Sequence, residues 1–384
     1  MRKLISSRFN FFLLVIMAAA FIPVLAAFKI NTAADAFIEL QNQRLNFIPK
    51  EFYIARIDDE RADRTLIGKI LPMKSNAGKP DETLKVDFKG GAAAAVKGFI
   101  DNSFTADKTL RPIIIKITTF SVVESPAANT RADGRIGLTI TFGFERDEEF
   151  IKLGDYSTAS TYQRNTGPPQ QVEPLLRNAI VNTVTYLNNW MNKQADTNIK
   201  LAKGVRINFT DHQESPEGDT IYYDINRPLR WDDFQLKPQN SKYGAEVFAS
   251  LGYNESISVS QGIINLKLDI KVYLPKSACW ARYEAMTNSS LVHEQHHFDI
   301  VKIVGEHFKK QILAEKLKPG NYDGPINMAY FDALREINAL QKQYDTETGH
   351  STNTYQQQLW NARIEKELQE LGIKPSPGQA AGLN

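Results

Sequence analysis

The sequence is poor in the residues that form disulfides and in those that most often bind zinc. It contains one cysteine and six histidines in 384 residues. A lone cysteine, Cys279, excludes an intrachain disulfide and any zinc site built from several thiolates. We expect Cys279, which precedes Trp280, to be a small buried residue rather than a nucleophile. A zinc site in this chain must therefore use His, Asp or Glu.

The chain also lacks an excess of charge of either sign. Its 46 Lys and Arg are balanced by 44 Asp and Glu, and the formal net charge is +2, with no block of like charge. Nucleic acids and anionic membranes are bound by surfaces on which positive charge is clustered. The composition, 42% hydrophobic and 23% charged, is instead typical of an ordinary globular protein. We expect no nucleic-acid partner.

Long apolar runs are absent except at the N-terminus. Arg2, Lys3 and Arg8 precede an apolar run over residues 11–26 that ends in small residues. This order is typical of a secretory signal peptide, and the run is short for a membrane-spanning helix of about 20 residues. We predict a cleaved signal peptide at residues 1–27. The mature chain is then exported, periplasmic or secreted, with no membrane span, or at most tethered by an uncleaved signal.

The region 28–204 has neither His nor Cys and offers no catalytic constellation. Its residues 28–47 are expected to be a polar, weakly helical lead-in. Apolar and polar residues alternate over 136–145, which indicates a half-buried strand. We predict an N-terminal α+β domain of unknown role, with strands near 52–57, 113–123 and 136–145 and helices near 90–104 and 173–193.

A second α+β domain is predicted over 205–372, followed by a disordered tail at 373–384. From Ile264 to Leu274 every even-numbered residue is apolar, which predicts an antiparallel strand with one wet face. We expect this strand to form the edge of a substrate cleft. Shorter strands are predicted near 246–251 and 256–260, helices near 288–317, 326–343 and 355–371, and a loop at 344–351.

The motif on which the functional prediction rests is His293-Glu294-x-x-His297. On a helix, residues four apart share one face and lie about 6 Å apart along the axis. Both imidazoles can therefore bind one Zn²⁺, with Glu294 beside the position where water binds. Zinc lowers the pKa of that water, and the carboxylate can accept its proton. The pattern predicts a zinc hydrolase.

The third zinc ligand does not follow from the motif. In the extended motif a Gly and a third His come next, but here their positions hold Ile300 and Ile303. His307 lies on the same face as His297 but roughly 15 Å further along the helix, too far to share the ion. The third ligand must therefore come from another segment.

Three residues are candidates for that ligand. We prefer His350, because imidazole is the commonest nitrogen ligand of zinc and five of the six histidines lie between 293 and 350. Asp345, on the same predicted loop, and the helical Glu336 are the alternatives. Tyr344 or Tyr283 can polarise a substrate carbonyl by hydrogen bonding. We take Tyr344 as the catalytic candidate, with packing as the alternative role of either tyrosine.

Four segments together resemble a known family. They are Pro-Leu-Arg-Trp-Asp-Asp-Phe at 228–234, Cys-Trp at 279–280, His-Glu-Gln-His-His-Phe-Asp-Ile at 293–300 and Tyr-Asp-Thr-Glu-Thr-Gly-His-Ser at 344–351. Over about 205–366 the chain resembles the bacterial domain-of-unknown-function family 922, exported proteins predicted to be zinc-dependent proteases. The resemblance implies a zincin-like domain, with Glu294 as base and the 344–351 segment in the site. It leaves the substrate open.

Together these observations predict an exported zinc metallopeptidase that acts on a peptide or protein. The zinc ligands are expected to be His293, His297 and His350, and the catalytic residues Glu294 and Tyr344. Two alternatives remain. One is a cell-envelope binding or assembly module with a structural zinc site, and the other is a zinc amidase that acts on the cell wall.

Overall fold

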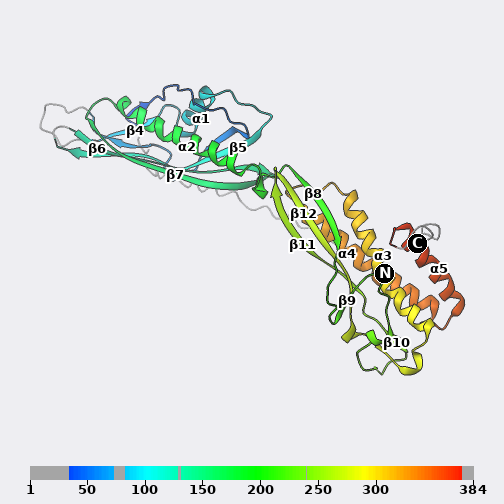
Figure 1. The fold of residues 1–384 in the computed structure, drawn as a ribbon. Helices are drawn as coiled ribbons and strands as arrows, with labels where there is room; N and C mark the ends of the chain where they lie inside the picture. The colour runs from blue at the N-terminus through cyan, green and yellow to red at the C-terminus, as the bar shows by residue number, and fades with distance from the viewer. Residues whose placement is uncertain (1–33, 73–82, 129–130, 239, 374–384) are drawn as a thin grey trace, which may run out of the picture.

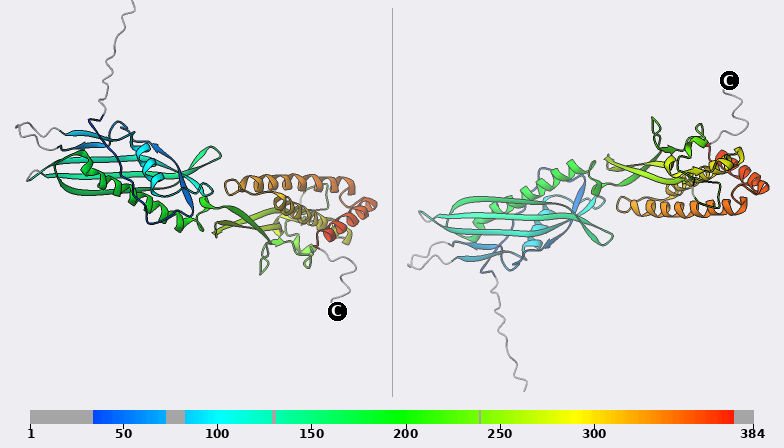
Figure 2. Two further views of the ribbon diagram at one scale, coloured as in Figure 1. Left: turned by 90° about the horizontal axis from the view of Figure 1, so that it is seen from above. Right: turned by 90° about the horizontal axis from the view of Figure 1, so that it is seen from below.

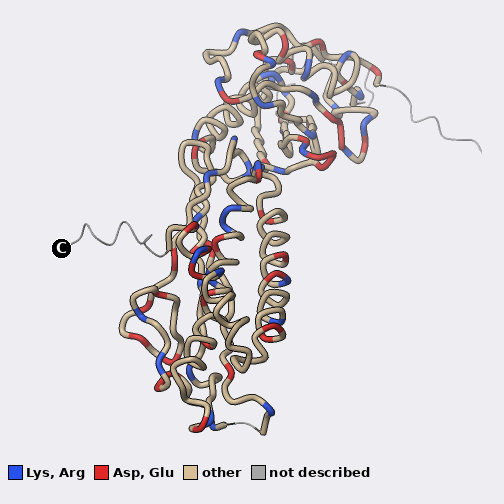
Figure 3. Tube along the Cα trace, turned by 90° about the vertical axis from the view of Figure 1, so that its right-hand side faces the viewer, with Lys and Arg blue, Asp and Glu red and all other residues tan. Residues whose placement is uncertain are grey.

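The computed structural model describes residues 34–72, 83–128, 131–238 and 240–373. The predicted signal peptide at 1–27 lies outside these residues, as does the predicted tail apart from Ile373. The described chain is a mixed α and β structure with several sheets and five α-helices, so the predicted α+β class is confirmed. Its two parts lie end to end in an elongated molecule (Figures 1 and 2). Acidic and basic residues are interspersed in both parts (Figure 3).

A seven-stranded sheet forms one layer of the N-terminal part. Its order is β1–β4–β3–β5–β6–β7, and β2 also pairs with β5. The three predicted strands are confirmed, but the weakly helical lead-in is wrong because β1 pairs in parallel with β4. β7 was not predicted at all. The strands are β1 (Ala36–Ile38), β2 (Phe52–Asp59), β3 (Gly68–Ile70), β4 (Leu84–Phe88), β5 (Arg111–Ala127), β6 (Arg131–Arg146) and β7 (Glu149–Asn165).

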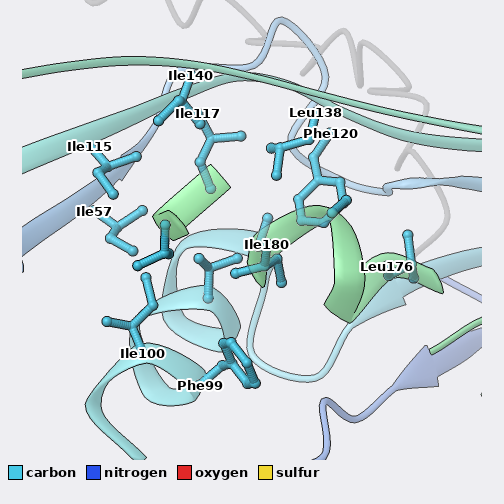
Figure 4. Packing of buried hydrophobic residues seen from close by; sticks show 14 of the residues in the cluster. Ile57, Phe99, Ile100, Ile115, Ile117, Phe120, Leu138, Ile140, Leu176 and Ile180 are labelled. Atoms are coloured by element: carbon cyan, nitrogen blue, oxygen red, sulfur yellow. The ribbon is translucent and has the colours of Figure 1, made fainter. Parts of the chain in front are cut away.

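Two helices form the second layer of this part, α1 (Ala92–Ser103) and α2 (Glu173–Gln194), both predicted. The alternation read in the sequence of β6 places its apolar residues on the face that the helices cover. Burial of these side chains is the main driving force for joining the layers. Figure 4 shows this core, with residues from both helices against residues from the sheet: Ile57, Phe99, Ile100, Ile115, Ile117, Phe120, Leu138, Ile140, Leu176 and Ile180.

The C-terminal part has its own sheet and its own hydrophobic core. The first core ends at Leu201 and the second begins at Ala202, beside the predicted boundary at 204/205. In the larger sheet β12 pairs with β11 and β9 antiparallel and with β8 parallel. The prediction that residues 264–274 form a cleft edge is therefore wrong, because β12 is an interior strand. The strands are β8 (Gly204–Asp211), β9 (Thr220–Tyr222), β11 (Ser250–Ser260), β12 (Ile263–Pro275) and the short pair β10 (Ala245–Glu246) and β13 (Trp280–Ala281).

Three helices complete this part: α3 (Asn288–Ala314), α4 (Asp323–Thr348) and α5 (Thr354–Glu370). α3 packs against β11 and β12, and α4 and α5 pack against α3. A Cβ atom on Gly305 would lie 3.3 Å from Val272 and 3.4 Å from Leu251, so this glycine lets α3 approach the sheet closely. None of the helices in the described ranges has the length and apolar character needed to cross a membrane.

The predicted loop at 344–351 is wrong over its first half, because α4 continues to Thr348. Tyr344 is fully buried, so packing holds this turn helical. The hydroxyl of Thr348 donates to the carbonyl of Tyr344, one turn earlier. The helix ends at Gly349, whose φ of 56° places it in the left-handed region that glycine adopts without strain.

We expect the core of the C-terminal part to be sensitive to loss of side-chain volume at β12. Leu268→Ala removes a side chain with 0% exposure and should lower the free energy of unfolding by about 2–5 kcal/mol. Ile257→Ala, on the neighbouring strand β11, is the matched control, because Ile257 is 43% exposed and should change stability by about 0.5 kcal/mol or less. Urea denaturation of both variants measures the difference. Equal losses would contradict the assignment of β12 to the core.

Candidate metal centre

Helix α3 places both histidines of the motif on one buried face. The side chain of Thr287 accepts a hydrogen bond from the backbone N–H of Ser290 and so caps the N-terminus of the helix. His293 and His297 follow one turn apart, with 2% and 9% of their surface exposed and ring centroids 5.0 Å apart. The helical spacing therefore brings the two imidazoles together, as predicted.

Asp345, near the end of α4, completes a group of three ligand-type side chains. Its Oδ1 atom lies 3.2 Å from Nε2 of His293 and 3.0 Å from Nε2 of His297. Candidate ligand atoms of these three residues all lie within 4.8 Å of one another. Two imidazole nitrogens and a carboxylate oxygen are a donor set that zinc accepts, so the residues present fit this metal.

The structure does not bring the preferred third ligand, His350, into this group. Its Nδ1 atom lies 3.4 Å from Oδ1 of Asp345, and its ring packs against Tyr243 with centroids 3.9 Å apart. Glu336 is engaged elsewhere, because its carboxylate accepts a hydrogen bond of 2.8 Å from His307. Of the three alternatives, Asp345 is the one that reaches both motif histidines.

Residues around the group fix the orientation of His293. Nδ1 of His293 donates to Oε1 of Gln357 on α5, at 3.0 Å, which leaves Nε2 directed at Asp345. The same Gln357 donates through Nε2 to the hydroxyl of Tyr344, at 2.7 Å. Such an orienting hydrogen bond is a regular feature of metal-binding histidines. Gln357 was not among the site residues predicted from the sequence.

The predicted catalytic role of Tyr344 disagrees with its position. The side chain is fully buried, and its hydroxyl donates to the backbone carbonyl of His293 at 3.3 Å. Its ring stacks on the ring of His293, with centroids 4.6 Å apart. Tyr344 therefore positions His293 and does not face a substrate. The alternative, Tyr283, is 86% exposed and does not line the cavity described below.

The electrostatics of the group suit a bound cation. Burial alone would raise the pKa of Asp345, but the hydrogen bonds from His293 and His297 outweigh it and lower that pKa well below its usual value. Asp345 is therefore ionised at neutral pH. A cation placed among these side chains would be bound by the carboxylate of Asp345 and by the Nε2 electron pairs of the two imidazoles.

Glu294 lies beside the group and is 5% exposed. Burial raises the pKa of this carboxyl, although the nearby histidines oppose the shift. Glu294 lines the cavity described below and is not among the fully buried polar groups that lack a hydrogen-bond partner, so its carboxylate is open to that cavity. A group with this surrounding is suited to accept a proton from water in the cavity.

A cavity of about 570 Å³ opens over these residues, within the size range of small-ligand sites. His293, Glu294, His297 and Asp345 are among its lining residues. The residues from Ala245 to Ser250, from β10 to the start of β11, also line it, as do Asn338 and Gln341 of α4. A substrate in this cavity would lie between the sheet and the motif helix.

Comparisons with known proteins do not identify the family. No family model matches the chain, and no curated protein matches it significantly. An uncharacterised protein of solved structure matches with 6% identity and a TM-score of 0.25, covering 41% of this chain and 97% of its own. A Xanthomonas campestris protein of the DUF330 family matches with 12% identity and a TM-score of 0.27, covering 41% and 93%. The resemblance to family 922 therefore stays a prediction.

The geometry predicts which residue is the third ligand. Loss of a residue that only supports a metal ligand lowers affinity by about 10–100-fold, and Asp345→Ala, which removes a ligand, should lower zinc affinity by more than this. His350→Ala should change it by less than about tenfold, or about 1.4 kcal/mol. Competition with a chelating dye measures both, and Asp332→Ala, an exposed position on α4, is the control. The reverse order would restore His350 as the ligand.

The hydrogen bond from His293 to Gln357 predicts a second effect on metal binding. Gln357→Leu removes the acceptor that orients the imidazole and should lower zinc affinity by about 10–100-fold. Gln358→Leu makes the same change at an exposed position of α5 and should leave affinity unchanged. Thermal melts of the metal-free variants show whether each folds. Equal affinities in two folded variants would remove Gln357 from the site.

Proposed function

We propose that this protein is a zinc-dependent metallopeptidase. The observation that carries the proposal is the convergence of His293, His297 and Asp345 beside a mostly buried carboxylate, Glu294, that is open to the cavity. Purely structural ion pairs do not require an acid open to a cavity next to them, whereas hydrolysis requires a base at that place. The cavity over these residues supplies room for a substrate.

The residues that would hold zinc are His293, His297 and Asp345. Bound there, the metal would acidify a water molecule and polarise a substrate carbonyl. Glu294 is the general base in this proposal. Burial raises the pKa of its carboxyl towards neutral pH, which makes the carboxylate a better proton acceptor. Tyr344 and Gln357 hold His293 in place while the proton moves.

The zincin-like architecture is part of the proposal. The motif helix α3 lies against β11 and β12, and the sheet and the helix flank the cavity. β11 pairs only with β12 among the described strands, and the hydroxyl of Tyr330 on α4 donates to the carbonyl of Leu251 on its outer edge, at 2.9 Å. The rest of this edge is the part that an extended peptide would pair with. This edge and the adjoining segment 245–250 take the place that we first expected residues 264–274 to occupy. The predicted signal peptide places the enzyme in the bacterial envelope or outside it.

Glu294→Gln tests the proposal directly. The substitution keeps the size of the side chain but removes the base, so hydrolysis should fall by about 10²–10⁴-fold. Zinc content, measured by atomic emission, should stay equal to that of the wild type. The probe is a library of fluorescence-quenched peptides, with and without a chelator. Equal turnover in both zinc-loaded proteins would exclude Glu294 as the base.

The position of His350 supports a second candidate function, a binding module with a structural zinc. The imidazole lies close enough to Asp345 that a small movement would make it a fourth ligand. A site closed by four protein ligands has no place for water and does not catalyse. In that case His350→Ala would weaken zinc binding strongly, and no peptide would be cleaved. The same assay with peptidoglycan fragments separates the cell-wall amidase from the peptidase.

A further inference from the structure

Strand β7, Glu149–Asn165, is an edge strand of the seven-stranded sheet. It pairs with β6 and with no other strand that the structure describes. At its beginning the ammonium of Lys200 donates to the carbonyl of Lys152, at 2.8 Å, and so covers that part of the edge. An irregularity in the ladder follows, and from Gly154 to Asn165 the pairing with β6 is regular. The regular part, about 40 Å long at ~3.4 Å per residue, presents unpaired backbone groups.

This edge lacks the features that protect exposed edges from pairing. Proteins usually guard them with charged residues, proline or bulges. From Tyr156 to Tyr162 the sequence is Tyr-Ser-Thr-Ala-Ser-Thr-Tyr, with none of these. The nearest charge, Asp155, is already neutralised by Lys152 at 2.7 Å and accepts a hydrogen bond from Thr141.

The same seven residues are complementary to themselves in an antiparallel pair. When Ala159 lies opposite Ala159 of a second copy, Thr158 lies opposite Ser160 and Ser157 opposite Thr161. Tyr156 then faces Tyr162. Hydroxyl pairs and aromatic pairs across strands stabilise a sheet by about 0.2–1 kcal/mol each, and this register places no like charges opposite one another.

The faces of the strand agree with this register. Tyr156 stacks on Tyr186 of α2, with centroids 4.2 Å apart, and Tyr162 donates to the buried Glu124, so both rings lie on the covered face. Ser157, Ala159 and Thr161 are exposed on the other face. Opposite residues of an antiparallel pair share a face, so the covered faces of two copies would be continuous. Ala159, the centre of this register, also lies near the middle of the regular part of the edge, from Gly154 to Asn165.

We propose that two copies of this chain associate through β7, antiparallel, about a two-fold axis at Ala159. The two N-terminal sheets then form one continuous sheet, and both α2 helices lie on the same side of it. A symmetric contact of this kind uses the same patch twice and closes on itself. It also satisfies the backbone groups of both edges, which a monomer leaves to water.

Cysteine cross-linking of the full chain tests the axis. Ala159→Cys should form a disulfide-linked dimer under mild oxidation, because opposed Cα atoms in an antiparallel pair lie about 4.5–5.5 Å apart, within disulfide range. The native Cys279 is fully buried, and the wild type measured in parallel controls for it. Val123→Cys is the matched control, an exposed position on the same face but on β5, and it should not cross-link. Equal cross-linking of the two variants would overturn the proposal.

A mixing experiment tests the register. Oxidised alone, Ser157→Cys and Thr161→Cys should each form no disulfide-linked dimer. In this register each cysteine lies about four residues along the strand from the same cysteine of the second copy, which is too far for a disulfide. Mixed, they should cross-link to each other, since Ser157 is opposite Thr161. Cross-linking of Ser157→Cys with itself but not with Thr161→Cys would contradict the register.

Disruption of the edge tests the association itself. Ala159→Lys places two like charges opposite each other and should lower dimer affinity by at least about tenfold, whereas Val123→Lys should not. Sedimentation equilibrium gives the masses, and unchanged zinc content shows that the metal centre is unaffected. A monomeric wild type, with its edge free or covered by a segment of its own chain, would overturn the proposal. So would a dimer that Ala159→Lys leaves intact.

Discussion

The stacking of Tyr344 on His293 is the contact on which the arrangement of the candidate metal centre depends. It joins α4 to α3 at the motif, and its hydroxyl, bound to Gln357, joins α5 as well. Because the ring is fully buried, the last turn of α4 stays helical and carries Asp345 towards the two imidazoles. Three helices thus hold together a group of candidate ligands that the motif alone would leave incomplete. Buried packing and hydrogen bonds both contribute to this arrangement.

The two parts of the chain place their polar side chains in different surroundings. The C-terminal part holds a small group of charged and polar residues mostly buried at the side of a cavity, and burial shifts the pKa of Glu294 while the histidines shift that of Asp345. The N-terminal part has its polar side chains on the open face of a long sheet, where hydroxyl and small residues predominate. The proposed hydrolysis uses the first property, and the proposed pairing of β7 uses the second. Association at β7 would leave the cavity of each copy on its own C-terminal part.

Sequence patterns predicted most helices and strands because the spacing of apolar residues in each matches the residues that its buried face contains. The alternation in β6 and β12 and the stripes in α2 and α3 reported which face is buried. The errors have a common cause. β7 has few apolar residues because one edge and one face are open to solvent, so it gave no signal. The end of α4 reads as a loop by its Thr and Gly content, and only the packing of Tyr344 extends the helix.

The sequence by itself determined the two motif histidines and Glu294, because a spacing of four residues on a helix fixes which side chains share a face. It also determined the α+β class and the absence of disulfides. The tertiary structure decided the third member of the group. His350 and Asp345 are five residues apart in the same segment, and which of them reaches the histidines depends on where α4 ends. That end is set by contacts between helices distant in sequence, which no local pattern records.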